Sequence, residues 1–175
     1  RLLYKAIDLD SSYAAAYGLA ARCFQFQRMF DWFAGDGALA EGAQLARTAA
    51  QVGPNDSEAL WMAGLALVHL SDEIDHSAAM IERSLSLNPN SANAWITACL
   101  LHSYLGETEK AIDAFDRAQR LNPLDLSQHL HWNMVAWAYL GAGRYTEAAE
   151  AAERTLHISP AYLPGLRLKM VTSAL

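Results

Sequence analysis

The sequence predicts an all-α protein in which antiparallel helix pairs stack into an α-α superhelix. Prolines recur at a nearly constant interval, since Pro54, Pro89, Pro123 and Pro160 are separated by 35, 34 and 37 residues. Small and large residues recur with them, and self-similarity at such a period is the signature of a repeat array. Each unit then buries its apolar face against its neighbours, so the core is expected to be a row of interfaces.

Each predicted unit opens with a helix that carries the same four positions. Small residues among them let two helix axes approach to about 8–10 Å, and large residues fill the space between neighbouring pairs. The four sets are Tyr17, Ala20, Ala21 and Phe24; Leu60, Ala63, Gly64 and Leu67; Trp95, Ala98, Cys99 and His102; and Trp132, Val135, Ala136 and Tyr139.

The period divides the chain into one domain of four repeats with a partial helix at each end. Both partial helices lack their partner helix, so we expect the chain to be a fragment of a longer protein. The predicted ranges are 1–10 for the first partial helix, 14–56, 57–90, 92–125 and 129–162 for the repeats, and 163–175 for the last partial helix.

Repeat one is too long, and its surplus around 28–36 is aromatic. Phe26, Phe30 and Phe33 are spaced i, i+4, i+7, and Trp32 adds a further ring. Two interpretations remain open. Either the first helix continues by two turns and packs this stripe on its own array, or Phe30, Trp32 and Phe33 form a loop interface for a partner.

Composition and charge exclude several classes of protein. A hydrophobic content of 53% with 18% charged residues excludes a disordered chain. No apolar run approaches the roughly 18–20 residues of a membrane span. The formal net charge is −6, and residues 57–128 hold four Lys or Arg against ten Asp or Glu. A nucleic-acid partner is not expected, because the basic stripe that it requires is missing.

The two cysteines indicate a reducing compartment. Cys23 and Cys99 are expected to be buried thiols in helix packing rather than a disulfide. With no visible targeting segment, this predicts a cytoplasmic protein.

The stretch 91–125 resembles a known repeat. Trp95, Ala98, Cys99 and His102 have the spacing W-x2-L-G-x2-Y, and Leu105-Gly106, Ala111-x3-Phe115 and Pro123 follow. This pattern resembles the tetratricopeptide repeat (TPR). Phrases at 87–95, 104–106, 121–125, 142–148 and 160–164 are similar to the C-terminal TPR region of bacterial class III adenylate or guanylate cyclase-like proteins or winged-helix signalling proteins. The resemblance covers nearly the whole chain and implies a TPR solenoid.

The resemblance also implies a function and a binding surface. A TPR array is expected to be a non-catalytic interaction module for a protein or peptide, for another domain of the parent chain, or for a second copy in a homodimer. The alternative is a small-molecule or peptide sensor that uses the same concave groove. The family's groove positions correspond here to Arg22, Phe26, Trp61, Leu65, His69, Ile96, Leu100, Tyr104, Asn133 and Trp137.

This groove is mainly apolar and aromatic. The family's clamp for a peptide carboxylate would need charges where Trp61, Leu65, Ile96 and Leu100 stand, so recognition of chaperone tails is disfavoured. Trp61 and Trp137 also have a second interpretation, as packing between adjacent first helices.

No spacing predicts catalysis, a metal site or a cofactor. His129 and His131 are two residues apart and therefore lie on different sides of a helix. An acidic strip has Lys110 and Arg117 nearby and fits a solvated helix face better than a pair of catalytic acids. Its members are Glu107, Glu109, Asp113 and Asp116. The chain is therefore predicted not to be an enzyme.

Overall fold

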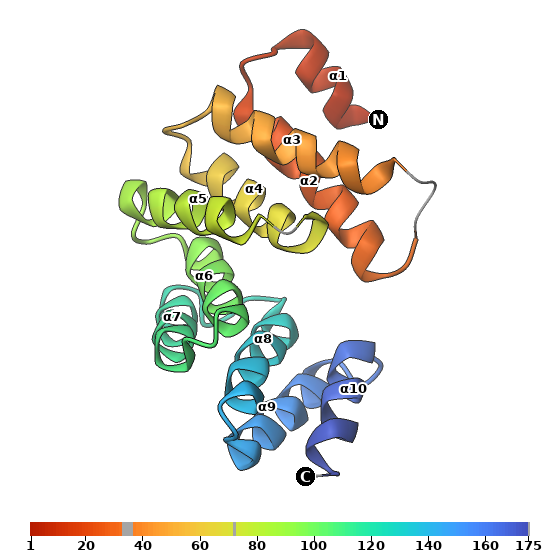
Figure 1. The fold of residues 1–175 in the computed structure, drawn as a ribbon, viewed down its shortest axis with the longest axis vertical. Coiled ribbons are helices and arrows are strands. Elements are labelled where there is room, and N and C mark those ends of the chain that lie inside the picture. The colour runs from red at the N-terminus through yellow and green to blue at the C-terminus, as the bar shows by residue number, and fades with distance from the viewer. Residues whose placement is uncertain (33–36, 72, 175) are drawn as a thin grey trace. The chain divides into compact units, whose positions relative to one another are not determined.

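The computed structural model describes residues 1–32, 37–71 and 73–174, and in these ranges it contains ten α-helices and no strand (Figure 1). This confirms the all-α prediction. None of the helices described is long and apolar enough to cross a membrane. The helices are α1 Leu2–Leu9, α2 Ala14–Met29, α3 Ala38–Val52, α4 Ser57–Leu70, α5 Ile74–Leu87, α6 Ala92–Tyr104, α7 Thr108–Leu121, α8 Gln128–Gly141, α9 Tyr145–Ile158 and α10 Leu163–Thr172.

The chain divides into two compact units. The N-terminal unit is Arg1–Thr97 and the C-terminal unit is Ala98–Leu175, so the boundary falls inside α6. The single domain that we predict from the repeat period therefore consists of two parts, each of which has its own set of packed helices.

Local sequence explains where several helices begin. The Asp56 carboxylate accepts a hydrogen bond from the Ala59 backbone N–H at 3.1 Å and so caps α4. The Ser91 hydroxyl plays the same part before α6, where it accepts from the Ala94 N–H at 3.3 Å. Pro164 stands in the first turn of α10, where its missing N–H leaves no bond unmade.

In the N-terminal unit, antiparallel helices pack through small side chains. α2 lies against α3 and α4, and α4 lies against α5. Ala21, Ala46 and Ala63 are fully buried in one cluster with Leu67, and Tyr17 and Phe24 pack against its edge. Small residues at the contact let the helices approach, and large ones close the remaining space.

The C-terminal unit follows the same rule. α8 packs on α9 and α7, and α10 packs on α9 and α8. Ala136, Ala148 and Ala152 are fully buried, while Leu168 of α10 has no exposed surface. The Phe115 ring meets the Trp132 ring edge-on at 4.7 Å, which joins α7 to α8.

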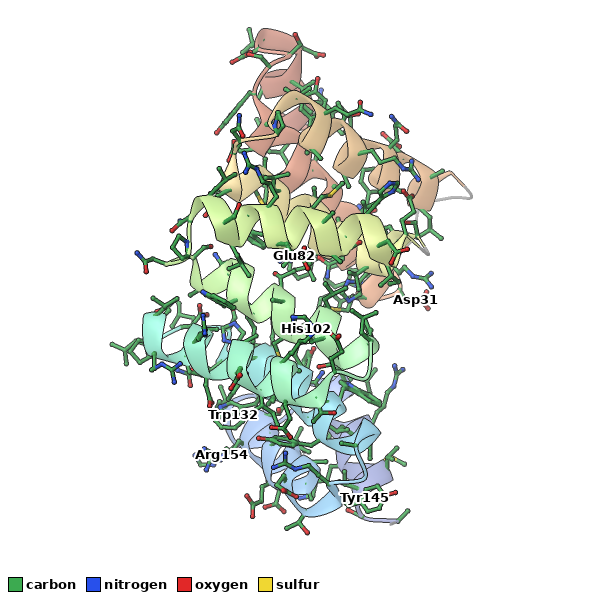
Figure 2. The ribbon with its side chains drawn as sticks, turned by 60° about the vertical axis from the view of Figure 1, so that its left-hand side comes forward. Asp31, Glu82, His102, Trp132, Tyr145 and Arg154 are labelled. Atoms are coloured by element: carbon green, nitrogen blue, oxygen red, sulfur yellow. The ribbon has the colours of Figure 1, made fainter. Side chains whose placement is uncertain are left out.

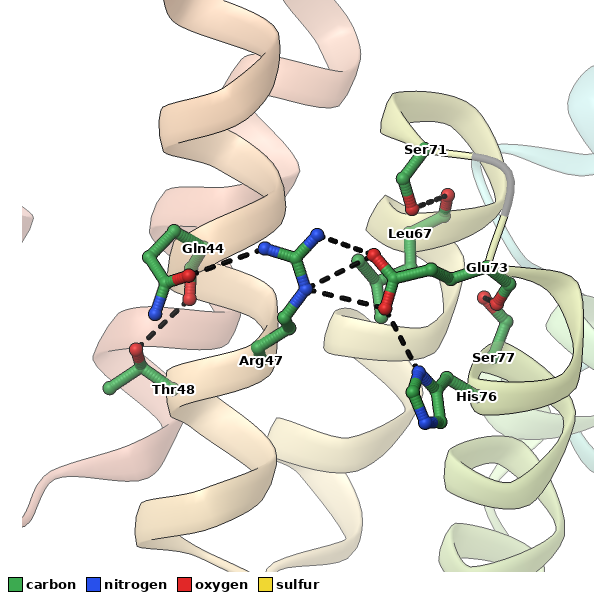
Figure 3. Close-up of polar contacts among 8 residues, drawn as sticks. All are labelled: Gln44, Arg47, Thr48, Leu67, Ser71, Glu73, His76 and Ser77. Carbon is green, nitrogen blue, oxygen red and sulfur yellow. Dashed lines mark hydrogen bonds and ion pairs between the residues drawn. The ribbon is translucent and has the colours of Figure 1, made fainter.

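A polar link joins α3 to the start of α5 (Figure 3). The Arg47 guanidinium donates to both carboxylate oxygens of Glu73, with Nε at 3.0 and 3.3 Å. His76 bonds the same carboxylate at 2.9 Å. The hydrogen bond from Arg47, which has the largest effect, and that from His76 lower the pKa of Glu73 from 4.5 to about 2.

The aromatic end of α2 differs from a simple helical extension. α2 ends at Met29, and Asp31 has a φ of 56°, a left-handed conformation that interrupts the helical path. Phe30 and Trp32 are 43% and 67% exposed, so the interpretation in which two further helical turns bury them is wrong. Phe33 lies outside the described residues.

Gly64 provides a test of the close helix contact. A Cβ at this position would lie 2.8 Å from Ile81 Cγ1 and 3.1 Å from the Ser77 carbonyl oxygen. We expect Gly64→Ala to lower the free energy of unfolding by about 1–3 kcal/mol, because α4 and α5 must separate. Urea denaturation measures the change.

Gly141 supplies the matched control, because nothing lies within 4 Å of an added Cβ there. Gly141→Ala is expected to leave stability unchanged or raise it by up to about 1 kcal/mol through helix propensity. Equal losses of stability in the two variants would contradict the close-approach explanation.

The link between Arg47 and Glu73 predicts a pH dependence. Because the pKa of Glu73 is lower in the folded chain, its contribution is complete above about 4.5 and is lost as the pH falls through about 2. We expect Glu73→Gln to cost about 0.5–1 kcal/mol at neutral pH, a small value because the pair is partly exposed. The difference from the wild type should shrink in urea denaturation below about pH 4.5. Glu82→Gln, on the exposed face of α5, is the control for loss of one carboxylate.

Candidate functional site

The predicted groove residues fall into two sets, one in each compact unit. The N-terminal unit holds six of them and the C-terminal unit holds four. The first set is Arg22, Phe26, Trp61, Leu65, His69 and Ile96, and the second is Leu100, Tyr104, Asn133 and Trp137.

Three side chains of the first set meet at one place. The guanidinium carbon of Arg22 lies 5.0 Å from the centre of the Phe26 ring and 5.2 Å from that of Trp61. Phe26 comes from the same turn of α2, while Trp61 comes from α4. Trp61 is held in turn by its indole N–H, which donates to Glu58 at 2.7 Å. Two aromatic rings therefore contact one cation.

Polar groups that lie around this cation are poorly solvated. Burial lowers the pKa of Arg22 to about 10. His69 donates from Nδ1 to the Leu65 carbonyl at 3.0 Å, and burial, with the charges of Arg22 and Arg28, lowers its pKa. Gln25, one turn along from Arg22, is only 2% exposed, and its Oε1 has no hydrogen-bond partner within the described part of the chain.

An aromatic row leads outward from Phe26. The Phe30 ring stacks on Phe26 with centres 6.4 Å apart, and Trp32 stacks on Phe30 at 5.0 Å. We call Phe26, Phe30 and Trp32 the ring row. Its outer two members are exposed, which is the arrangement expected of the loop-interface interpretation.

The second set includes both buried and exposed residues. Leu100 and Asn133 are buried, whereas Tyr104 and Trp137 are 55% and 41% exposed. The Oδ1 of Asn133 has no hydrogen-bond partner among the residues described. α6 and α8 meet beside it, where the Ser103 hydroxyl lies 3.4 Å from the Met134 carbonyl. Two aromatic side chains thus remain accessible on first helices of this unit.

The C-terminal unit also has a hollow that none of the predicted groove residues lines. It has a volume of about 750 Å³, and the Arg154 guanidinium lies over the Trp132 ring at 4.5 Å beside it (Figure 2). Five of its lining residues are spaced i, i+3, i+4, i+7 and i+8 on α9, and this spacing could have indicated from the sequence that they share one face of the helix. The lining residues are Trp132, Glu150, Glu153, Arg154, His157 and Ile158.

The histidines and acids of this unit are used in packing and surface pairs. His129 contacts the Tyr162 ring edge-on at 5.1 Å, and His131 is buried. Glu107 accepts from Lys110 and from His102, both at 2.7 Å. Within the described ranges, no group of three His, Cys, Asp or Glu side chains is placed to hold a metal ion.

The cysteine prediction is half right. Cys99 is fully buried, and burial raises the pKa of its thiol to about 12. Cys23, however, is exposed. The correction follows from register: Cys23 lies between the packing positions Ala20 and Ala21 and the packing position Phe24, so its side chain points off the contact face.

Comparison with known proteins identifies the fold. Residues 92–123 match the family model of the tetratricopeptide repeat. TTC0263, a thermophilic TPR protein in Thermus thermophilus, matches with a TM-score of 0.71 and 18% identity over 99% of this chain and 88% of that chain. YrrB, a TPR protein with an unusual peptide-binding site, matches with a TM-score of 0.63 and 21% identity over 96% and 80%.

MamA from Desulfovibrio magneticus matches with a TM-score of 0.61 and 16% identity over 90% of this chain and 84% of that chain. No curated protein matches the sequence significantly. These comparisons show the TPR fold, and the repeat at 92–123 is matched in sequence as well. The proteins named here are not described as cyclase-like or winged-helix proteins, so that part of the resemblance stays a prediction.

The exposure of the two thiols gives a direct test. We expect a thiol reagent to label one cysteine of the native chain rapidly and the second only after unfolding, because thiolate formation at Cys99 is suppressed by burial. Cys23→Ser should abolish the rapid phase and Cys99→Ser should keep it. Rapid labelling of Cys23→Ser would contradict the burial of Cys99.

Proposed function

We propose that this chain is a protein-interaction module that binds a peptide or protein segment through the first helices of its repeats. The observation that carries this proposal is the exposure of aromatic side chains at groove positions, Tyr104 and Trp137 above all. Large, stiff rings of this kind anchor partners at small cost in side-chain entropy. The TPR fold supports the same function, and YrrB is described as having a peptide-binding site.

A non-catalytic role fits the arrangement of the polar groups. Several carboxylates of the described residues lie in surface ion pairs, such as Glu147 and Glu109 with Arg144 at 2.9 and 3.2 Å. Several polar side chains also come together in the hollow beside Trp132. Its Arg154 is already engaged by the ring, and no nucleophile with a neighbouring base lines it.

The wider context of the module is also part of the proposal. The phrases at 87–95 and 142–148 support a regulatory domain of a larger, cytoplasmic bacterial signalling protein, either adenylate cyclase-like or a transcriptional regulator. In that setting the bound segment is another domain of the parent chain or a second copy. The open reading frame that encodes the chain tests this directly, because its neighbouring domain would be a cyclase or a winged helix.

A small-molecule sensor is the second candidate. The hollow of about 750 Å³ favours it, since that volume falls in the range of ligand pockets. It lies beside Trp132 rather than at the predicted groove positions. A metabolite that shifts the melting temperature of the wild type, but not of Trp132→Leu, would support this candidate.

The interaction function is tested by panning a random-peptide library on the purified chain. Selected peptides should bind the wild type. The double variant Trp137→Ala, Tyr104→Ala should bind them at least tenfold more weakly, because each exposed ring is expected to contribute about 2 kcal/mol to the binding free energy. Calorimetric titration measures the affinities.

The matched control is Tyr145→Ala, which removes an exposed ring from the second helix α9. Circular dichroism checks that helical content is kept in all variants. Peptides that bind the folded double variant with unchanged affinity would contradict the assignment of these positions.

A further inference from the structure

We infer that the N-terminal unit contains an anion-binding anchor at Arg22, which takes the side-chain carboxylate of an acidic residue in an otherwise apolar segment. This inference rests on the proposed function, because it names the partner's chemistry at one part of the predicted groove. The anchor consists of the Arg22 guanidinium, the rings of Phe26 and Trp61, and the side chain of Gln25.

Within the described part of the chain, Arg22 is a poorly solvated cation without an anionic partner. Among the residues that the structure describes, no carboxylate forms an ion pair or hydrogen bond with it, although the chain has a net charge of −6. By contrast, the surface arginines Arg47 and Arg144 both bond glutamates. The faces of two rings offset part of the lost hydration, but they leave the in-plane N–H donors without acceptors.

The neighbouring residue Gln25 also has an unsatisfied polar group. It is only 2% exposed, and its Oε1 accepts no hydrogen bond from any described group. A buried carbonyl in this state lowers stability. Gln25 lies one helical turn from Arg22, so two poorly satisfied polar side chains stand on neighbouring turns of α2.

The charges around Arg22 are mainly positive. Those of Arg22 and Arg28 both lower the pKa of His69, because they oppose its protonation. Glu58, the acid on the other side of Trp61, already accepts the indole N–H. The local field therefore favours an anion, and a carboxylate matches the planar fork of a guanidinium.

The ring row determines what else the partner carries. The guanidinium lies 5.0 Å from the Phe26 ring, and 6.4 Å separate Phe26 from Phe30. About three residues of a polyproline II segment, at about 3.1 Å each, cover this path. Because that conformation has three residues per turn, an apolar side chain three positions from the acid would face the same way and reach the exposed rings of Phe30 and Trp32.

The anchor differs in its residues from a clamp for chain termini. A terminal carboxylate would need several cations around it, and Trp61 and Leu65 occupy neighbouring groove positions with apolar side chains. A single guanidinium flanked by rings suits one side-chain carboxylate within an apolar segment.

The experiment uses short fluorescein-labelled peptides in an anisotropy titration with the whole chain. The parent peptide has an amidated C-terminus, one glutamate, and a leucine three residues later in a serine and alanine background. One matched peptide replaces the glutamate by glutamine, and another replaces the leucine by serine. A fourth has glutamine in place of glutamate, and a free terminal carboxylate three residues after the leucine.

The protein variants are Arg22→Met, which keeps the aliphatic stem, Arg22→Lys, and Arg83→Met as the matched control. Arg83 is an exposed arginine of the same unit that bonds the Pro54 carbonyl and Asn55. We expect the wild type and Arg83→Met to prefer the glutamate peptide over the glutamine peptide by at least about tenfold. Arg22→Met should bind both peptides equally, and Arg22→Lys should keep part of the preference.

Stability provides an independent readout. Because Arg22→Met removes a half-buried charge that has no carboxylate partner among the described residues, its melting temperature should equal or exceed that of the wild type without peptide. If Arg22→Met does not fold, Arg22→Lys replaces it in the test. A smaller preference for the glutamate peptide in Arg22→Lys than in the wild type would then support the anchor, and an equal preference would contradict it.

Four results would overturn the inference. Equal binding of the glutamate and glutamine peptides by the wild type, or a preference that survives in Arg22→Met, would leave peptide binding by the module without the anion anchor. Absence of binding to any of the peptides would remove the anchor and leave the library experiment to decide the proposed function. Tighter binding of the free-carboxylate peptide than of the glutamate peptide would assign the site to chain termini instead.

Discussion

The close approach of paired helices is the constraint on which the structure depends. At Gly64 the facing helix α5 comes so near that a methyl group would overlap Ile81, and at Gly165 it would overlap Thr155. Fully buried alanines continue these contacts in both units. Interiors are packed at crystal-like density, so the points of closest approach admit only small side chains. Large side chains such as Leu67 and Ile81 fill the space beside these points, and others occupy the remaining faces of the helices.

This division of faces explains why the aromatic residues gather where they do. On α2 the contact face is filled by Ala20 and Ala21, and Arg22 and Phe26 project from an adjoining face. Trp61 on α4 reaches the same place and completes the contact with the cation. A repeat that is built for packing thus leaves one face of each first helix free to carry chemistry that the fold does not need.

Electrostatics contributes little to the fold itself. The ion pairs of the described residues are mostly at the surface, where solvent screens them, and the bond between Arg47 and Glu73 is the most extensively hydrogen-bonded of them. Arg22 differs, because it is poorly solvated and pairs with no carboxylate of the residues that the structure describes. A charge in that position costs stability in the free chain and gives specificity when an anion arrives.

The sequence by itself determined the helical class, the period and the contact faces. The recurrence of Ala63, Ala98 and Ala136 with large residues was sufficient, because close packing restricts those positions in every unit. Only the tertiary structure decided that α2 ends at Met29, that Cys23 is exposed, and that Arg22 meets two rings from two helices. The hollow beside Trp132 likewise needs side chains of two helices. Periodicity reports which face a residue occupies, whereas a site forms from side-chain directions of separate helices, which no single stretch of sequence specifies.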